Sequence, residues 1–463
     1  MPTLPVVALA AYLAAVLAIG LAWRRRAGRD EASFFLADRS LGTFWGVIGH
    51  ASLTTGGSTT VALAALVYTY GLPGLWLDLS GALGLAALGF FLARRVRREA
   101  AVTLPEIVGR HYGETARKVA AVLVLASEIV WFALLTETTQ VVLTAALGIA
   151  PTGALLLATA VFVTYTALGG QFAVVRTDLL QYGLMLVGIP GVALVCALRG
   201  AGGFSGLPAE LLSFPTSPSF GISDILAMLV LIGLPHMVGS DVYLKLLSCR
   251  DEETARRSAL LASVSKVLFG LSVAMIALAA RAALPPLGVA GGASHALPAA
   301  VLGFAPPALA ALVLVALVAT MQTSADVVLL SATAVTARDL APPILGGPMP
   351  LWAARLLAPI YGALGLATAL ALNRDVLDTL KLGYSIFAAG LILPVLAALW
   401  PGIPRVPPRG AIAAMAAGGI AAAVGRFAPE LYGGHDPVLV GTALNAAVLV
   451  AAWAAGRARS RRE

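Results

Sequence analysis

Charged residues are scarce in this chain of 463 residues. Asp, Glu, Lys and Arg make up 12% of it, about half of what a soluble domain carries. The two cysteines, Cys196 and Cys249, fall in different hydrophobic segments, so no disulfide framework is expected. No nucleophile–base pair, metal cluster or phosphate loop is visible, so an enzyme is not expected. The hydrophobic content of 59% instead indicates a polytopic membrane protein.

Hydrophobic segments long enough to cross a bilayer follow one another along the chain. About 20 apolar residues span a hydrocarbon core of about 30 Å. The expected fold class is therefore an all-α polytopic membrane protein with about 13 transmembrane helices. The expected spans are 3–23, 43–68, 73–93, 118–147, 151–169, 177–198, 222–246, 258–283, 297–336, 350–372, 380–400, 409–428 and 437–456.

The basic residues indicate how the chain is oriented. Most of the 31 Lys and Arg residues lie in alternate connections, for example at 24–29, 94–98 and 457–462. Cytoplasmic loops carry such an excess, which predicts an outside N-terminus and a cytoplasmic C-terminus in the cell membrane. The net charge of +8 is thus a topology signal, and no nucleic-acid partner is expected. The first span is not expected to be a cleaved signal, because its basic cluster follows the apolar run.

Two hydrophobic segments contain residues that interrupt a helix. The second segment contains Gly56 and Gly57, and the seventh contains Pro235 and Gly239. Unwound backbone at membrane depth must line a cavity or be buried in protein. Four further spans follow each interrupted one, which predicts an inverted repeat of two five-span units. The alternative is that these glycines and prolines only ease helix packing.

The chain divides accordingly into five parts. They are an N-terminal helix and basic cytoplasmic loop (1–42), the first repeat (43–198), an extracellular loop (199–221), the second repeat (222–400), and two C-terminal helices with a basic tail (401–463). Inside the first repeat, Thr103 is expected to cap a short helix with Pro105 in its first turn.

Polar residues gather in the ninth span. Thr320, Thr323 and Ser324 stand at i, i+3 and i+4 and share one helix face. Oxygen ligands without thiolate or imidazole suit a hard cation such as Na+. Asp326 lies close by, and a carboxylate in hydrocarbon is costly unless it faces a partner, a cavity or an ion.

Five motifs together resemble the sodium:solute symporter family. They are FFLADRSLG at 34–42, TLPEIVGRHYG at 103–113, YTALGGQFAVVRTDLLQ at 165–181, CRDEETARRSALL at 249–261 and TSADVVLLSATAVTARDL at 323–340. The resemblance implies a LeuT-like five-plus-five inverted repeat. It also implies Na+-coupled symport into the cell of a small organic solute, such as an amino acid, sugar, carboxylate or vitamin-like compound. A monomer is expected to suffice.

The resemblance further implies three groups of site residues. For Na+ it implies the backbone carbonyls of Ser52, Thr55 and Thr320 with the hydroxyls of Thr323 and Ser324. For a second cation site or an ion exit path it implies Asp178 and Asp326, although Arg176 is an alternative partner for Asp178. For the solute it implies Thr59 and Asp78. Gly56 at the first break, Glu137 on the fourth span and His236 beside the second break are further candidates from the sequence itself.

The nature of the solute and of the coupling ion stays open at this point. Several acids and few bases near the midplane favour a solute with an amine or many hydroxyls. For Glu137, the alternative to contact with the solute is a structural pairing with a base such as Lys266. One rival is an H+-coupled symporter of the same fold, with Asp178, Asp326 or a histidine as carrier. Another is a transporter-like solute sensor, which the lack of an output domain before Glu463 disfavours.

Overall fold

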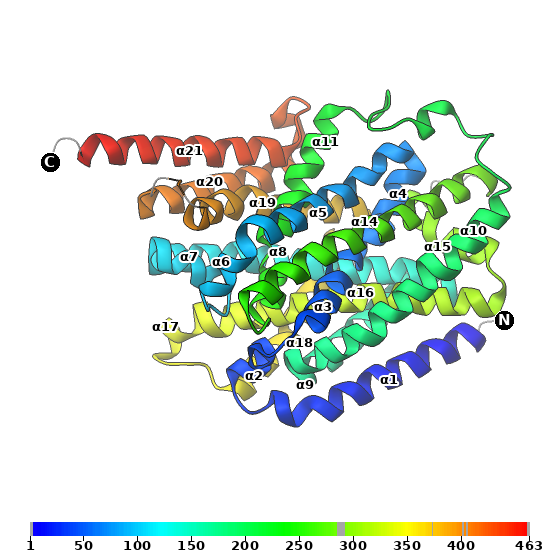
Figure 1. The fold of residues 1–463 in the computed structure, drawn as a ribbon, viewed down its shortest axis with the longest axis horizontal. Coiled ribbons are helices and arrows are strands. Elements are labelled where there is room, and N and C mark those ends of the chain that lie inside the picture. The colour runs from blue at the N-terminus through cyan, green and yellow to red at the C-terminus, as the bar shows by residue number, and fades with distance from the viewer. Residues whose placement is uncertain (1–2, 285–291, 373, 401, 404–405, 461–463) are drawn as a thin grey trace.

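The computed structural model describes residues 3–460, except 285–291, 373, 401 and 404–405. The described residues form a bundle of long, mutually tilted helices, and the two chain ends lie at opposite ends of the bundle (Figure 1). The last basic residues, at 461–462, lie outside the described residues.

The described helices account for about 13 spans, as expected. Two of these spans, the second and the fifth, are not single long helices of their own. Eleven of these helices are long and apolar enough to cross a membrane. The expected second span consists of two short helices, α3 (Thr43–Thr55) and α4 (Ser58–Tyr70). The expected fifth span is the first part of α9 (Pro151–Leu186), which continues through a kink at Gly170 into the sixth. The fifth and sixth spans are therefore joined without the expected loop.

Two five-span units make up most of the bundle. The first contains α3, α4, α5 (Trp76–Ala87), α6 (Ala93–Arg98), α8 (Glu114–Leu147), α9 and α10 (Leu194–Ala201). The second contains α11 (Ile222–Met228), α12 (Leu234–Val238), α13 (Ser240–Leu247), α14 (Glu252–Ala283), α16 (Pro307–Val335), α18 (Leu351–Leu372) and α19 (Val376–Leu399). Because each unit has an odd number of spans, the second enters the membrane from the opposite side to the first. This is the expected inverted arrangement.

The remaining helices flank these units. They are α1 (Thr3–Ala27), α2 (Glu31–Leu36), α7 (Leu104–Tyr112), α15 (Ala296–Phe304), α17 (Ala341–Leu345), α20 (Pro408–Phe427) and α21 (Pro437–Ser460). The helix α15 was expected to be part of the ninth span, which was wrong. The chain is extended at Ala305 and Pro306, and α16 begins with Pro307 in its first turn, where a missing N–H does no harm.

The short expected elements outside the spans are present. The hydroxyl of Thr103 accepts the backbone N–H of Glu106 at 3.1 Å and caps α7, with Pro105 in the first turn. The long connection 202–221 contains only one 3-10 turn, Ala209–Leu212.

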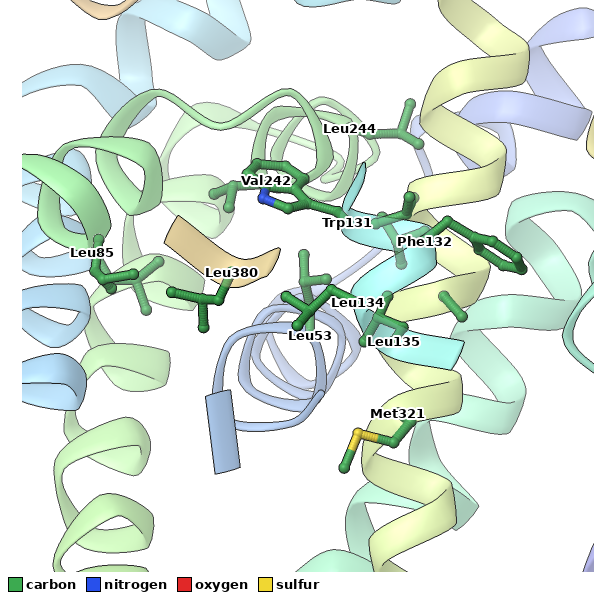
Figure 2. Packing of buried hydrophobic residues seen from close by; sticks show 14 of the residues in the cluster. Leu53, Leu85, Trp131, Phe132, Leu134, Leu135, Val242, Leu244, Met321 and Leu380 are labelled. Carbon is green, nitrogen blue, oxygen red and sulfur yellow. The ribbon is translucent and has the colours of Figure 1, made fainter. Parts of the chain in front are cut away.

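The helix α16 runs through the centre of the molecule. It packs against α1, α3, α8, α9 and α18, and its residues from Val313 to Val335 are all buried. Figure 2 shows Leu134 and Leu135 of α8 beside Leu53 of α3, with Met321 of α16 below them in this view. The polar face of α16 therefore meets the interrupted span inside the protein and not in lipid.

Candidate functional site

The first break separates α3 from α4. The helix α3 ends at Thr55, Gly56 is extended, and Gly57 has a φ of 66°. Only glycine adopts that left-handed conformation without strain. A helix that ends here leaves the carbonyls of its last turn without intrahelical partners. The carbonyls of Ser52 and Leu53 face α16, where they accept the hydroxyls of Thr323 and Ser324.

Three of the expected Na+ ligands meet at this break. The Thr323 hydroxyl lies 3.1 Å from the Ser52 carbonyl and 2.9 Å from the Thr320 carbonyl. The Thr320 carbonyl also accepts the Gly57 N–H at 2.6 Å. All three expected ligand residues are fully buried.

The space that these oxygens share is the position of the missing side chain of Gly56. A Cβ built there would lie 2.6 Å from the Ser52 carbonyl oxygen, 2.9 Å from the Thr320 carbonyl oxygen and 3.1 Å from the Thr323 hydroxyl. Three uncharged oxygens thus lie within 3.1 Å of one point. This donor set fits a hard monovalent cation, because it contains oxygen only and no formal charge.

The other two expected ligand groups have other hydrogen-bond partners in this conformation. The Ser324 hydroxyl donates to the Leu53 carbonyl at 3.2 Å, and it would lie 2.6 Å from a Cβ on Gly57. The Thr55 carbonyl accepts the hydroxyl of Thr60 at 3.1 Å.

Asp178 does not pair with Arg176, contrary to the expected alternative. The Arg176 guanidinium lies over the rings of Trp23 and Trp45, with its carbon 4.7 and 4.0 Å from their centroids. Asp178 instead forms a fully buried ion pair with Lys245 of α13, at 2.5 Å. An ammonium from the second unit therefore neutralises this carboxylate, close to the first break.

Asp326 has a different environment from Asp178. One of its oxygens accepts the Thr166 hydroxyl at 2.8 Å, and the other has no hydrogen-bond partner among the described residues. On the same helix, Gln322 accepts the Tyr12 hydroxyl at 2.6 Å. The two aspartates therefore have separate partners in this conformation.

A small cavity lies between the two breaks. It is lined by Leu53, Thr54, Gly56, Gly57, Ser58, Thr59, Trp131, Leu134, Leu135, Pro235, His236, Asp241, Val242, Ser324, Val328 and Tyr384. Figure 2 shows Leu53, Trp131 and Val242 converging on this region from α3, α8 and α13. Its volume of about 40 Å³ holds a few water molecules. An organic solute can therefore enter only after the surrounding helices separate.

Three of the five expected solute residues line this cavity: Gly56, Thr59 and His236. The imidazole of His236 has Nδ1 2.8 Å from the Ile232 carbonyl, so that nitrogen carries the proton. Glu137 lies elsewhere, in a second pocket with His295 and Asp375.

Asp78 lies outside the cavity lining and is paired. The Lys266 ammonium donates to it at 2.8 Å and also donates to the Thr54 carbonyl. Lys266 was considered as a partner for Glu137, which was wrong. Lys266 and Asp78 neutralise each other's charge. The pair lies next to the last turn of α3, where Lys266 contacts the Thr54 carbonyl.

The lining also contains residues that the sequence did not indicate as site residues: Trp131, Asp241 and Tyr384. Asp241 stands two residues after Gly239, whose extended backbone separates α12 from α13. A polar residue directly after an expected break was an available signal. Trp131 and Tyr384 lie in the middle of α8 and α19, where nothing local distinguishes them from packing residues.

Two interrupted spans around a buried oxygen cluster and a small cavity define the fold of an inverted-repeat membrane transporter. The family model of the sodium:solute symporter family matches residues 34–418, and the chain belongs to that family. The expected family and fold class are therefore confirmed, and the chain is a multi-pass membrane protein.

Comparison with single proteins agrees with this assignment. The chain is 26% identical to the high-affinity choline transporter 1 of Caenorhabditis elegans over 60% of its own length and 50% of that protein. It is 26% identical to sodium/proline symporter 2 of Staphylococcus saprophyticus over 49% and 47%. The chain thus spans about half the length of these curated relatives.

Solved structures share the fold at low identity. A Na+-coupled sialic acid symporter in a substrate-bound outward-open state matches with a TM-score of 0.82 and 18% identity over 96% of both chains. Mhp1, a nucleobase-cation-symport-1 family transporter, matches with a TM-score of 0.61 and 13% identity over 94% and 96%.

Proposed function

We propose that this protein is a secondary active transporter that couples the entry of Na+ to the import of a small organic solute. The observation that carries the proposal is the convergence of the Ser52, Thr320 and Thr323 oxygens on the position of the missing Gly56 side chain. The proposal includes the cell membrane as location, with the N-terminus outside, and assigns no chemical conversion of the solute.

The proposed Na+ ligands are the carbonyls of Ser52, Thr55 and Thr320 and the hydroxyls of Thr323 and Ser324. They come from α3 in the first unit and from α16 in the second. A cation bound by both helices stabilises the conformations in which α3 and α16 lie close enough to share it. Binding of Na+ promotes solute binding only as far as it prefers the solute-ready conformation.

The cavity residues Gly56, Thr59 and His236 are proposed to contact the solute. Because Gly56 and Ser324 belong to both the proposed Na+ site and the cavity lining, the two sites are adjacent. Alternating access then requires the two five-span units to move relative to each other, since the cavity is too small for an organic solute in this conformation.

We propose a single Na+ per transport cycle. The second cation site expected around Asp178 and Asp326 is not part of this proposal and stays an untested prediction. The Lys245 ammonium, 2.5 Å from Asp178, already supplies a cation there. A fixed positive charge and a second Na+ on the same carboxylate would repel each other at close range. A single-site Na+ dependence is therefore expected.

Uptake into proteoliposomes from a mixed solute library, with and without an inward Na+ gradient, tests the transport proposal. Accumulation that follows the Na+ gradient supports it. Accumulation that follows a pH gradient and ignores Na+ supports the H+-coupled alternative. Asp326 is then the best-placed carrier, because among the described residues it has a hydroxyl partner and no basic one, whereas Asp178 is paired with Lys245. Specific solute binding without any uptake supports the sensor alternative.

A further inference from the structure

We propose that the transported solute carries a positively charged, alkyl-substituted nitrogen, with Asp241 as its counter-charge and the rings of Trp131 and Tyr384 as its walls. This inference rests on the proposed transport function and names the solute class for that same cavity. Choline-like cations and amino acids with an alkylated amine share the required group.

Asp241 is a half-buried carboxylate without a basic partner among the described side chains. One of its oxygens accepts the Val242 N–H at 2.8 Å, and the residue lines the cavity. Two other aspartates of the bundle, Asp178 and Asp78, are each neutralised by a buried lysine. Asp326 and Glu128 instead accept hydroxyl groups and are closed off from solvent, whereas Asp241 faces the cavity. A carboxylate at membrane depth calls for such a positive charge, and a cationic solute in the cavity supplies it.

Aromatic rings surround the same space. The ring centroids of Trp131 and Tyr384 are 4.7 Å apart, and His236 stacks on Tyr384 at 6.5 Å with an interplanar angle of 10°. The negative face of such rings attracts a cation, and cages of this kind recognise quaternary ammonium groups. The indole Nε1 of Trp131 has no hydrogen-bond partner among the described residues, so packing holds this ring in place.

Gly383 on α19 explains how Trp131 reaches this position. A Cβ on Gly383 would lie 2.6 Å from Cδ1 and 2.9 Å from Nε1 of the indole. The Cδ1–Nε1 edge of the ring therefore lies against α19 at Gly383, one residue before Tyr384. A second carboxylate, that of Glu128, lies on the same face of α8 as Trp131, because the two residues are three positions apart. Glu128 accepts the Ser331 hydroxyl at 2.6 Å.

Positive charge is absent from the described lining of this cavity, which contains no Lys or Arg. The nearby ammonium of Lys266 is taken by Asp78 and by the Thr54 carbonyl. A simple organic anion would find only the start of α4, at Ser58 and Thr59, as a positive region. That region can hold the carboxylate of a zwitterion, but it leaves Asp241 without a partner if the solute is an anion.

The test uses the full chain, purified in detergent with NaCl, and ligand-induced thermal stabilisation. The probes are choline, its uncharged isostere 3,3-dimethylbutan-1-ol, betaine, L-proline, lactate and a neutral hexose. At least one of the three ammonium compounds is expected to stabilise the protein saturably. The isostere is expected to bind at least about tenfold more weakly than choline if choline is the ligand.

Two variants of Asp241 and a matched control separate charge from folding. Asp241→Asn is expected to weaken binding of the ammonium compound by about 10- to 100-fold, while the stabilisation by Na+ alone persists. Asp241→Glu is expected to keep the preference for the cation. Asp224→Asn is the control, because this side chain caps the start of α11 at Gly221 on the same span and does not line the cavity.

Three results would overturn the inference and leave the proposed function standing. They are saturable Na+-dependent binding of lactate or the hexose, no response to any ammonium compound in a protein that Na+ stabilises, and unchanged ammonium affinity in Asp241→Asn. A protein that responds neither to Na+ nor to any solute would overturn the proposed function as well.

Discussion

The two broken spans differ in what they present to the protein interior. At the first break, around Gly56, the groups that face the interior are backbone carbonyls and the hydroxyls of α16, all without formal charge. At the second break, around Gly239, the chain presents the carboxylate of Asp241 beside aromatic rings. Uncharged oxygens suit a cation that must be bound weakly and released, whereas a lone carboxylate selects a charged solute.

The largest effect is expected from the buried ion pair beside the first break. Lys245→Met or Asp178→Asn each leaves one uncompensated buried charge, which costs about 3 to 5 kcal/mol of stability. The double variant removes both charges and is expected to regain most of that loss. Thermal unfolding of all three proteins measures this. If the single variants are as stable as the double variant, the pair does not hold the two units together.

A substitution at the first break is expected to remove the Na+ response completely. The methyl group of Gly56→Ala would occupy the point that the three oxygens share, since it would lie 2.6 Å from the Ser52 carbonyl. The thermal stability of the variant is therefore expected to be equal in NaCl and KCl. Gly183→Ala is the control, because a Cβ there meets nothing within 4 Å. A Na+ response that survives Gly56→Ala would place the cation elsewhere.

Removal of a single hydroxyl ligand is expected to have a graded effect. Thr323→Ala and Ser324→Ala should each raise the Na+ concentration at half-saturation by about 10-fold or more, because a hydrogen bond or ligand to a charged group contributes about 1.5 to 3 kcal/mol. Thr333→Ala is the matched control on α16, since among the described residues its buried hydroxyl bonds only to the Leu329 carbonyl. Unchanged Na+ dependence in both variants would contradict the ligand assignment.

The smallest effect is expected in the aromatic wall of the cavity, beside the second break. Gly383→Ala would push the Trp131 ring away from α19 and is expected to weaken solute binding by up to about 10-fold, which corresponds to about 1.4 kcal/mol. The Na+ midpoint is expected to stay the same. A shift of the Na+ midpoint as large as the shift in solute affinity would show that the two breaks do not have separate roles.

The contrast between the two breaks also explains which features could be predicted from the sequence. The span pattern, both breaks and the Thr320–Ser324 face follow from local composition and helical spacing, because hydrocarbon tolerates few other arrangements of the backbone. The partners of the charged residues do not follow from spacing. Lys245 and Asp178 are 67 residues apart in the chain, and Lys266 and Asp78 are 188 apart, so only packing brings them together.

The aromatic walls of the cavity were missed for a related reason. Trp131 and Tyr384 are large apolar residues in the middle of long helices, where most such side chains simply pack. Only the contact between α8 and α19, made possible by Gly383, identifies them as neighbours of the cavity. Asp241 was the exception, because its position directly after a break could have marked it.

The most direct test of the Na+ site at the first break needs no knowledge of the solute. Thermal unfolding of the purified protein should be followed over a NaCl titration at constant ionic strength, with KCl as the replacement salt. We expect saturable, single-site stabilisation by Na+ that reaches about 2.7 kcal/mol at 100 times the midpoint concentration. Equal stability in NaCl and KCl at all concentrations would contradict the assignment of this break to Na+.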